Sequence, residues 1–180
     1  DTYSHNNYQQ RTTNMKYADA RPKIKSGDIL AWTHKPLRNW YDFQVQLVRV
    51  FTKSEYTHVG VAYVDGDRVF VLESVSSGIR MKLLSEEVPF FWLPCDIGWN
   101  DEVKKAAFSK FGQSYSKWEG ILSVWLKLKP GGNNHWECAE YVNFILQQAG
   151  YETNIRNIPA EVVSWAQNIL DAPLYTVSQQ

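Results

Sequence analysis

Cysteine is scarce in this sequence: Cys95 and Cys138 are the only two among 180 residues. Two thiols allow at most one bridge, which excludes the disulfide-stapled scaffolds common among small secreted domains. Cys95 lies in the apolar segment 89–95, typical of a buried structural thiol. Cys138 comes at the start of a predicted helix, where a thiol can be reactive. We therefore expect the two cysteines to lie apart.

An excess of charge of either sign is also absent, because 19 basic residues balance 19 acidic ones. Without a basic block, no nucleic-acid partner is expected. No apolar run reaches the roughly 18 residues of a membrane span, and the start, at an Asp, shows no signal-peptide pattern. No His or Cys spacing typical of metal ligands occurs, so neither metal nor other cofactor is expected. The sequence predicts a soluble protein and leaves its compartment open.

What the chain does contain suits one globular domain, with 44% hydrophobic residues. Residues 1–22 are polar and are predicted to form a loose or docked arm, with order beginning near Ile24. Residues 23–180 are predicted to form the single domain. Aromatic residues are abundant; most should fill the core, and the surplus suits a sugar or peptide ligand.

Hydrophobic periodicity and turn signals predict both strands and helices. Short strands are expected at 29–32, 79–84 and 89–93. Helices are expected at 37–51, 101–111, 135–149 and 160–170, with Gly150 ending the third. The elements predict an α+β fold, with an antiparallel sheet or small barrel packed against helices.

The clearest local pattern is a hairpin formed by residues 58–64 and 67–73. Asp65-Gly66 between them is the standard signal for a type I′ turn. With that two-residue loop, Val64 faces Asp67 and His58 faces Glu73, with Cβ atoms about 4.5–5.5 Å apart. A carboxylate so close would orient the imidazole and favour its protonated form, as in a catalytic triad.

Cys138 is the candidate nucleophile for this pair. The loop 130–134 feeds its helix, so the thiol should lie near the first turn, where the helix dipole favours a thiolate and backbone amides can donate to an oxyanion. Taken singly, His58 reads as a packed strand residue, Glu73 as an exposed strand end and Cys138 as a core thiol. The predicted pairing of His58 with Glu73 favours catalysis.

Four motifs resemble the circularly permuted NlpC-type cysteine hydrolases. They are Ser26-Gly-Asp-Ile29, Tyr56-Thr-His-Val-Gly60, Val71-Leu-Glu-Ser74 and Trp136-Glu-Cys-Ala-Glu140, in the order of the permuted members. The resemblance spans roughly residues 25 to 165. It implies a permuted papain-like fold with its nucleophile, Cys138, at a helix N-terminus, His58 as base and Glu73 as the third member.

The resemblance also suggests pocket residues. Gly112-Gln-Ser-Tyr-Ser-Lys-Trp118 is similar to a family segment whose tyrosine lies near the thiol, which implies that Tyr115 lines the pocket; a core role for it is an equal alternative. Tyr56 and His135 are further candidates for the substrate pocket or oxyanion site, although His135 also suits an exposed helix cap.

The resemblance implies a hydrolase of amide or ester bonds working through a Cys138 thioester, with peptidoglycan stem peptides as first substrate. Glu137-Cys-Ala-Glu140 matches neither the Asp-Cys-Ser-Gly of unpermuted endopeptidases nor the Asn-Cys-Glu type of acyltransferase relatives. Two alternatives therefore stay open. One is a lipid acyl hydrolase or acyltransferase with a groove lined by 90–92 or 121–128. The other is a non-catalytic component of an assembly such as a virion, docked through residues 1–22.

Overall fold

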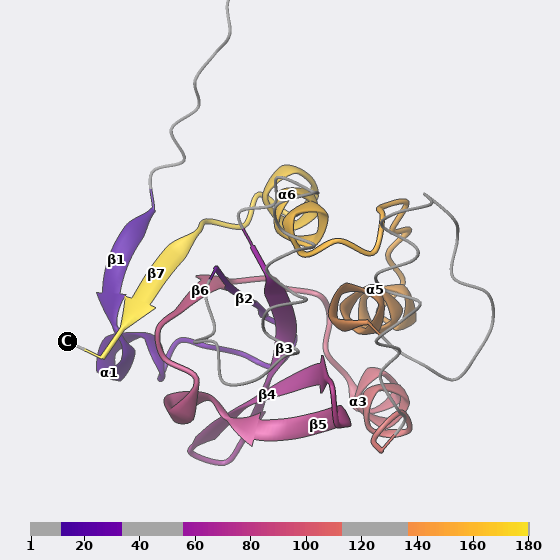
Figure 1. Cartoon of the computed structure of the whole chain (residues 1–180), viewed down its shortest axis with the longest axis horizontal. Coiled ribbons are helices and arrows are strands. Elements are labelled where there is room, and N and C mark those ends of the chain that lie inside the picture. The colour runs from indigo at the N-terminus through magenta and orange to yellow at the C-terminus, as the bar shows by residue number, and fades with distance from the viewer. Residues whose placement is uncertain (1–11, 34–55, 113–136, 180) are drawn as a thin grey trace, which may run out of the picture.

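The computed structural model describes residues 12–33, 56–112 and 137–179. In these ranges the protein is α+β, with a seven-stranded mixed sheet and four α-helices (Figure 1). The strands are β1 Thr13–Lys16, β2 Ile29–Trp32, β3 His58–Asp65, β4 Arg68–Val75, β5 Gly78–Leu83, β6 Phe90–Leu93 and β7 Tyr175–Ser178. The helices are α1 Tyr17–Ala20, α3 Asp101–Phe108, α5 Cys138–Gln148 and α6 Pro159–Ile169, with a 3₁₀ turn η1 at Leu84–Glu86.

The strand order is β1-β7-β6-β2-β3-β4-β5. Every pair is antiparallel except β1 and β7, which run parallel. Figure 1 shows α3 and α5 on one side of the molecule and α1 beside β1 and β7 at the other. The strands β3, β4 and β5 form one end of the sheet, and α5 packs against β3 and β4.

Most predicted elements in the described ranges are confirmed. The helix expected at 101–111 is α3, whose start is fixed by the Asn100 side chain accepting from the N–H groups of Glu102 and Val103. Gly150 follows α5 with a φ of 91°, the left-handed conformation that ends a helix. The helix expected at 37–51 lies outside the described residues.

Order begins before Ile24, contrary to the sequence prediction. Residues 13–16 form β1, which pairs with β7 at the edge of the sheet. The chain then turns through α1, where Ala20 is fully buried. This strand is hard to recognise in the sequence because its residues are mostly polar and mostly exposed, as suits an edge strand. Part of the polar arm is thus docked on its own domain.

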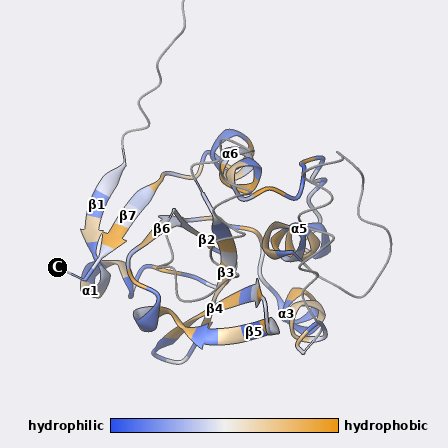
Figure 2. Cartoon of the chain, in the orientation of Figure 1, coloured by the Kyte–Doolittle hydropathy of each residue, from blue (hydrophilic) through white to orange (hydrophobic). Residues whose placement is uncertain are grey.

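Two hydrophobic clusters lie on the two faces of the sheet. The first joins Val59, Val61 and Leu72 to residues of α3, α5 and α6. The second joins Leu30, Trp32 and Val71 to residues of α1, η1 and β6. Alternate strand residues therefore face different clusters, as the two-residue period of a strand requires. Figure 2 shows hydrophobic and hydrophilic residues interleaved along the helices, as expected of helices with one buried side.

The hairpin of β3 and β4 differs from the predicted register by two residues. Asp65 faces Arg68, so the two loop residues are Gly66 and Asp67. Gly66 has a φ of 59°, and Asp67 is not among the described residues with positive φ. Glycine first, with one positive φ, is the pattern of a type II′ turn, not the predicted I′. His58 therefore does not stand directly opposite Glu73.

Candidate functional site

His58 and Glu73 are nevertheless in contact. The His58 Nε2 atom lies 2.6 Å from Glu73 Oε2. The Glu73 side chain is fully buried and that of His58 is 12% exposed. A buried carboxylate at this distance fixes the ring and stabilises an imidazolium. The predicted proximity is confirmed, although the predicted register was wrong.

The contact survives the register shift because the shift is an even number of residues. Continuing the ladder from Val61–Leu72 places Glu73 opposite Gly60, and His58 two residues further along the same face. Such diagonal neighbours are within reach of long side chains. Gly60 has no room for a side chain, because a Cβ atom there would lie 2.6 Å from Val71 Cγ2 and 2.9 Å from the Leu72 carbonyl oxygen. The two strands thus approach closely beside the pair.

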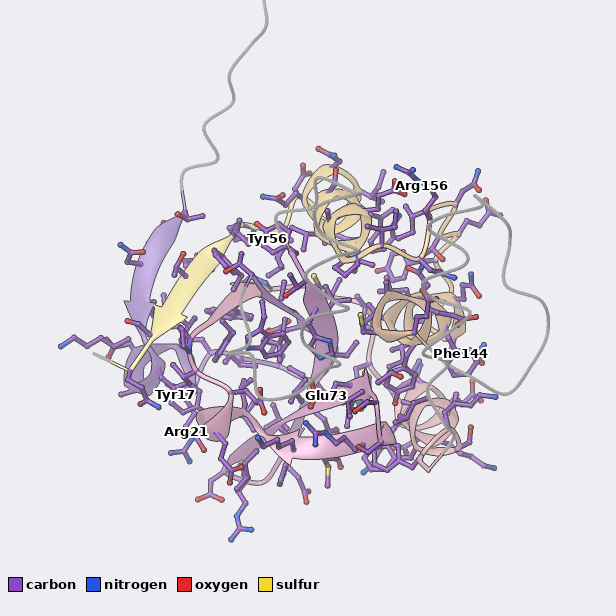
Figure 3. The ribbon with its side chains drawn as sticks, viewed as in Figure 1. Tyr17, Arg21, Tyr56, Glu73, Phe144 and Arg156 are labelled. Carbon is purple, nitrogen blue, oxygen red and sulfur yellow. The ribbon has the colours of Figure 1, made fainter. Side chains whose placement is uncertain are left out.

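Arg80 joins His58 and Glu73 in this cluster, and the sequence analysis missed it. Its Nε and Nη2 atoms donate to Glu73 Oε1 at 3.0 and 2.8 Å, and its ladder partner on β4 is Glu73. Glu73 therefore bonds His58 through one oxygen and Arg80 through the other. The signal was available: a two-residue Ser76-Ser77 turn between the predicted strands pairs residue 73 with residue 80. In Figure 3, Glu73 lies in the interior, between β3 and β5.

Trp32 and Thr57 hold the start of β3 in place. The rings of Trp32 and His58, paired across β2 and β3, have centroids 5.4 Å apart. The Trp32 indole donates to the Glu87 carbonyl, and the Thr57 N–H donates to the Trp32 carbonyl. The His58 ring is therefore packed between an aromatic residue and the Glu73 carboxylate.

Cys138 is the first residue of α5, as the sequence predicted. The helix starts with a capping box in which the Glu137 N–H donates to the Glu140 carboxylate at 3.3 Å. The thiol is partly buried and free of any disulfide. Backbone N–H groups of a first helical turn favour an anion there, whereas the two neighbouring glutamates oppose one.

The structure does not join the thiol to the imidazole by a hydrogen bond. Among the residues described, the bonds of His58 and the contacts of Cys138 do not include one another. Cys138 packs against the first cluster, whereas His58 contacts Trp32 of the second. Tyr56, just before β3, belongs to the first cluster, so the backbone changes face near Thr57. The thiol and the His58 ring thus pack against different clusters.

Cys95 behaves as the sequence predicted of a structural thiol. It is buried, and its Sγ donates to the Leu93 carbonyl at 3.3 Å. Burial, followed by the nearby Asp28 charge, raises the pKa of this thiol to about 12, against the lowering effect of a backbone hydrogen bond. Both cysteines are free. The expectation that they lie unbridged is confirmed.

The predicted pocket residues are only partly placed. Tyr56 is 7% exposed and its ring packs edge-on against Phe91, so it serves the core in this structure. Tyr115 and His135 lie outside the described residues. Phe90 and Trp92, expected as one possible lining of an apolar groove, are buried in the second cluster. These two side chains therefore give the lipid alternative no support. Residues 121–128, the other possible lining, lie outside the described ranges.

The described ranges contain neither a metal-ligand cluster nor a helix that could span a membrane. There, no three His, Cys, Asp or Glu side chains gather in a way that could hold a metal ion. Among the same residues, no helix has the length and apolar character needed to cross a membrane.

Comparison with solved structures reveals distant structural similarity, whereas the sequence comparisons reveal none. No family model matches the sequence. No curated protein matches it either. A solved structure described as the metalloprotein YiiX from Escherichia coli O157:H7 aligns over 85% of this chain and 88% of its own, with 17% identity and a TM-score of 0.48. Similarity at this level does not establish a shared activity.

Proposed function

We propose that this protein is a cysteine hydrolase of amide or ester bonds, with a permuted papain-like arrangement in which Cys138 is the nucleophile and His58 the base. The observation that carries the proposal is the buried contact of His58 with Glu73. Buried ionisable pairs rarely add net stability relative to apolar residues of similar size. This pair lies at the start of β3, where the imidazole packs against Trp32, and its position supports a role in proton transfer.

The chemistry would proceed in two steps. The Cys138 sulfur attacks the substrate carbonyl carbon, and the imidazolium of His58 gives its proton to the departing amine or alcohol, which leaves a thioester. Neutral His58 then takes a proton from water, whose oxygen attacks the thioester carbon; the acid leaves, and the Cys138 thiolate and the His58 imidazolium are restored. Because Nε2 bonds Glu73, both proton transfers pass through Nδ1. Backbone amides at the start of α5 are the candidate oxyanion donors.

Peptidoglycan stem peptides are the proposed substrate, on the resemblance of the four motifs. A lipid acyl substrate has less support, because Phe90 and Trp92 are buried in the core and cannot line an open apolar groove. Docking on an assembly through the arm also has less support, since residues 13–16 already pair with β7 of the same chain.

Purified muropeptides and p-nitrophenyl acyl esters test the reaction. Wild-type protein should release new amino groups from muropeptides, and Cys138→Ala and His58→Ala should each abolish the release. Cys95→Ala is the matched control, a cysteine removed away from the proposed site, and should retain turnover. Cleavage that persists in Cys138→Ala would assign the activity elsewhere. A folded wild-type protein inactive on both substrates would favour a binding role.

Thiol labelling tests the nucleophile independently of substrate. With a pKa of about 12, only on the order of one Cys95 thiol in ten thousand is ionised at pH 8. Iodoacetamide should therefore label native protein at Cys138 alone, faster than it labels glutathione, and His58→Ala should slow that labelling at least about tenfold. Labelling no faster than that of glutathione would contradict an activated thiol.

A further inference from the structure

Arg80 holds the Glu73 carboxylate in a fixed orientation. Its guanidinium donates two hydrogen bonds to one carboxylate oxygen, while the other oxygen faces His58. The two residues are also directly opposed on β4 and β5. A planar fork of this kind restrains a carboxylate more than a single point charge does. Glu73 therefore cannot turn away from His58 without breaking both bonds.

The charges in this cluster depend on Arg80. Glu73 carries one negative charge, which Arg80 balances when His58 is neutral. Protonating His58 then places a second positive charge on the same carboxylate. Without Arg80, the charged imidazole and the buried carboxylate would form a neutral pair, and the ring would hold its proton more tightly.

We propose that Arg80 is a positioning residue that orients Glu73 and keeps His58 able to lose its proton near neutral pH. The role in turnover rests on the proposed hydrolase function. The effect on His58 titration does not rest on it. A base trapped as imidazolium could not accept the proton of the attacking water, so this balance matters most for thioester hydrolysis.

Other charged groups on the same part of the sheet are already paired with one another. Lys82, two residues from Arg80 on β5, contacts the carboxylates of Glu87 and Glu86. From β2, the residue against the ring is Trp32, which carries no charge. Glu73, in direct contact with His58, and Arg80, bonded to Glu73, are the charges whose effect on the titration of His58 the proposal concerns.

The test is an NMR pH titration of the His58 ring in the full chain, with the signal assigned by its loss in His58→Ala. Arg80→Met should raise the His58 midpoint by about one pH unit. Arg80→Lys keeps the charge and should hold the midpoint within about 0.3 unit of wild type. Arg80→Gln replaces the Met variant if that protein fails to fold.

Arg68→Met is the matched control. Arg68 lies on β4 of the same hairpin, is exposed and makes no ion pair among the described residues, so its loss changes net charge alone. It should leave the midpoint within about 0.2 unit of wild type. A His58 midpoint that Arg80→Met leaves unmoved, or that Arg68→Met moves equally, overturns the proposal.

Activity separates this proposal from the proposed function. If wild type hydrolyses a substrate, kcat should fall at low pH with an apparent pKa. In Arg80→Met that apparent pKa should rise by the same amount as the NMR midpoint. A shifted midpoint with an unmoved apparent pKa would refute the positioning role in turnover. If wild type hydrolyses nothing, the hydrolase proposal fails, while the titration still decides whether Arg80 controls His58.

Discussion

Two buried carboxylates in this protein, Asp28 and Glu73, accept hydrogen bonds from different kinds of donor. Asp28, 2% exposed, accepts from the N–H groups of Lys25 and Cys95 and from the Trp92 indole, at 2.8–2.9 Å. Glu73, fully buried, bonds two side chains that carry or can carry positive charge, His58 and Arg80. Asp28 joins the turn before β2 to the end of β6, and Glu73 joins three neighbouring strands.

The difference separates a structural carboxylate from one suited to proton transfer. The donors of Asp28 are neutral and do not titrate, so its bonds persist as long as the fold does. One donor of Glu73 is an imidazole, which changes charge in the physiological range. Substitution should therefore affect stability at Asp28 and chemistry at Glu73.

Glu73→Gln should have the largest effect. The amide keeps the size of the side chain and removes the charge that orients His58 and stabilises its protonated form. We expect kcat/KM to fall on the order of 10³-fold, about 4 kcal/mol, in the hydrolase assay. Asp28→Asn, assayed at a temperature where it is folded, should stay within about threefold of wild type. Equal losses in the two variants would remove the distinction.

Asp28→Ala should have the next largest effect, and it should fall on stability. Two buried donors and one partly buried donor lose their acceptor. Each buried loss costs on the order of 1 kcal/mol or more, so we expect a loss of about 2–3 kcal/mol. Urea denaturation followed by tryptophan fluorescence measures it. Asp19→Ala, on the exposed surface of α1, is the control and should change stability by less than about 0.5 kcal/mol.

The sequence predicted the Glu73 region better than the Asp28 region because hairpin pairing is local. His58 and Glu73 lie on one hairpin. Any register that differs from the predicted one by an even number of residues leaves them on the same face of the sheet. The turn type was mistaken because Asp-Gly also fits an arrangement in which glycine comes first in the loop. Asp28 bonds Trp92 and Cys95, which lie more than 60 residues away in the sequence. No local pattern reports such contacts.

The rest of the fold was hard to predict for similar reasons. Strands β1 and β7 lie near opposite ends of the sequence. Each is too short and too polar for the alternation of hydrophobic and polar residues to indicate a strand. The place of Cys138 within its helix followed from the loop before it, since helix starts are local. Where that thiol lies relative to His58 depends on how α5 crosses the sheet, which strand periodicity does not determine.

Gly60→Ala should have a smaller effect that spreads across the Glu73 region. The added methyl group would meet Val71 Cγ2 and the Leu72 carbonyl oxygen at less than 3.0 Å, and Glu73 Cβ at 3.5 Å. We expect a stability loss of about 2 kcal/mol, because β3 and β4 must separate. Gly66→Ala, where a Cβ meets no atom within 4 Å, tests the turn rather than the contact. If Gly60→Ala left both stability and the His58 titration unchanged, the close approach of the strands would not matter.

The smallest predicted effect is the pH dependence of stability that Asp28 contributes. Burial raises the pKa of this carboxyl above 3.8, outweighing the lowering effect of its hydrogen bonds with Lys25, Cys95 and Trp92. The folded state then binds the proton more tightly than the unfolded state does, so stability falls as pH rises from 3.8 through the folded pKa. Asp28→Asn cannot titrate, so the stability advantage of wild type over Asp28→Asn should shrink over that window and then stay constant. Urea midpoints of both proteins, measured from pH 3.5 to 7, give this difference, in which the shared carboxylates cancel. An advantage that grows with pH would mean that the three donors outweigh burial and that the fold favours the charged form of Asp28.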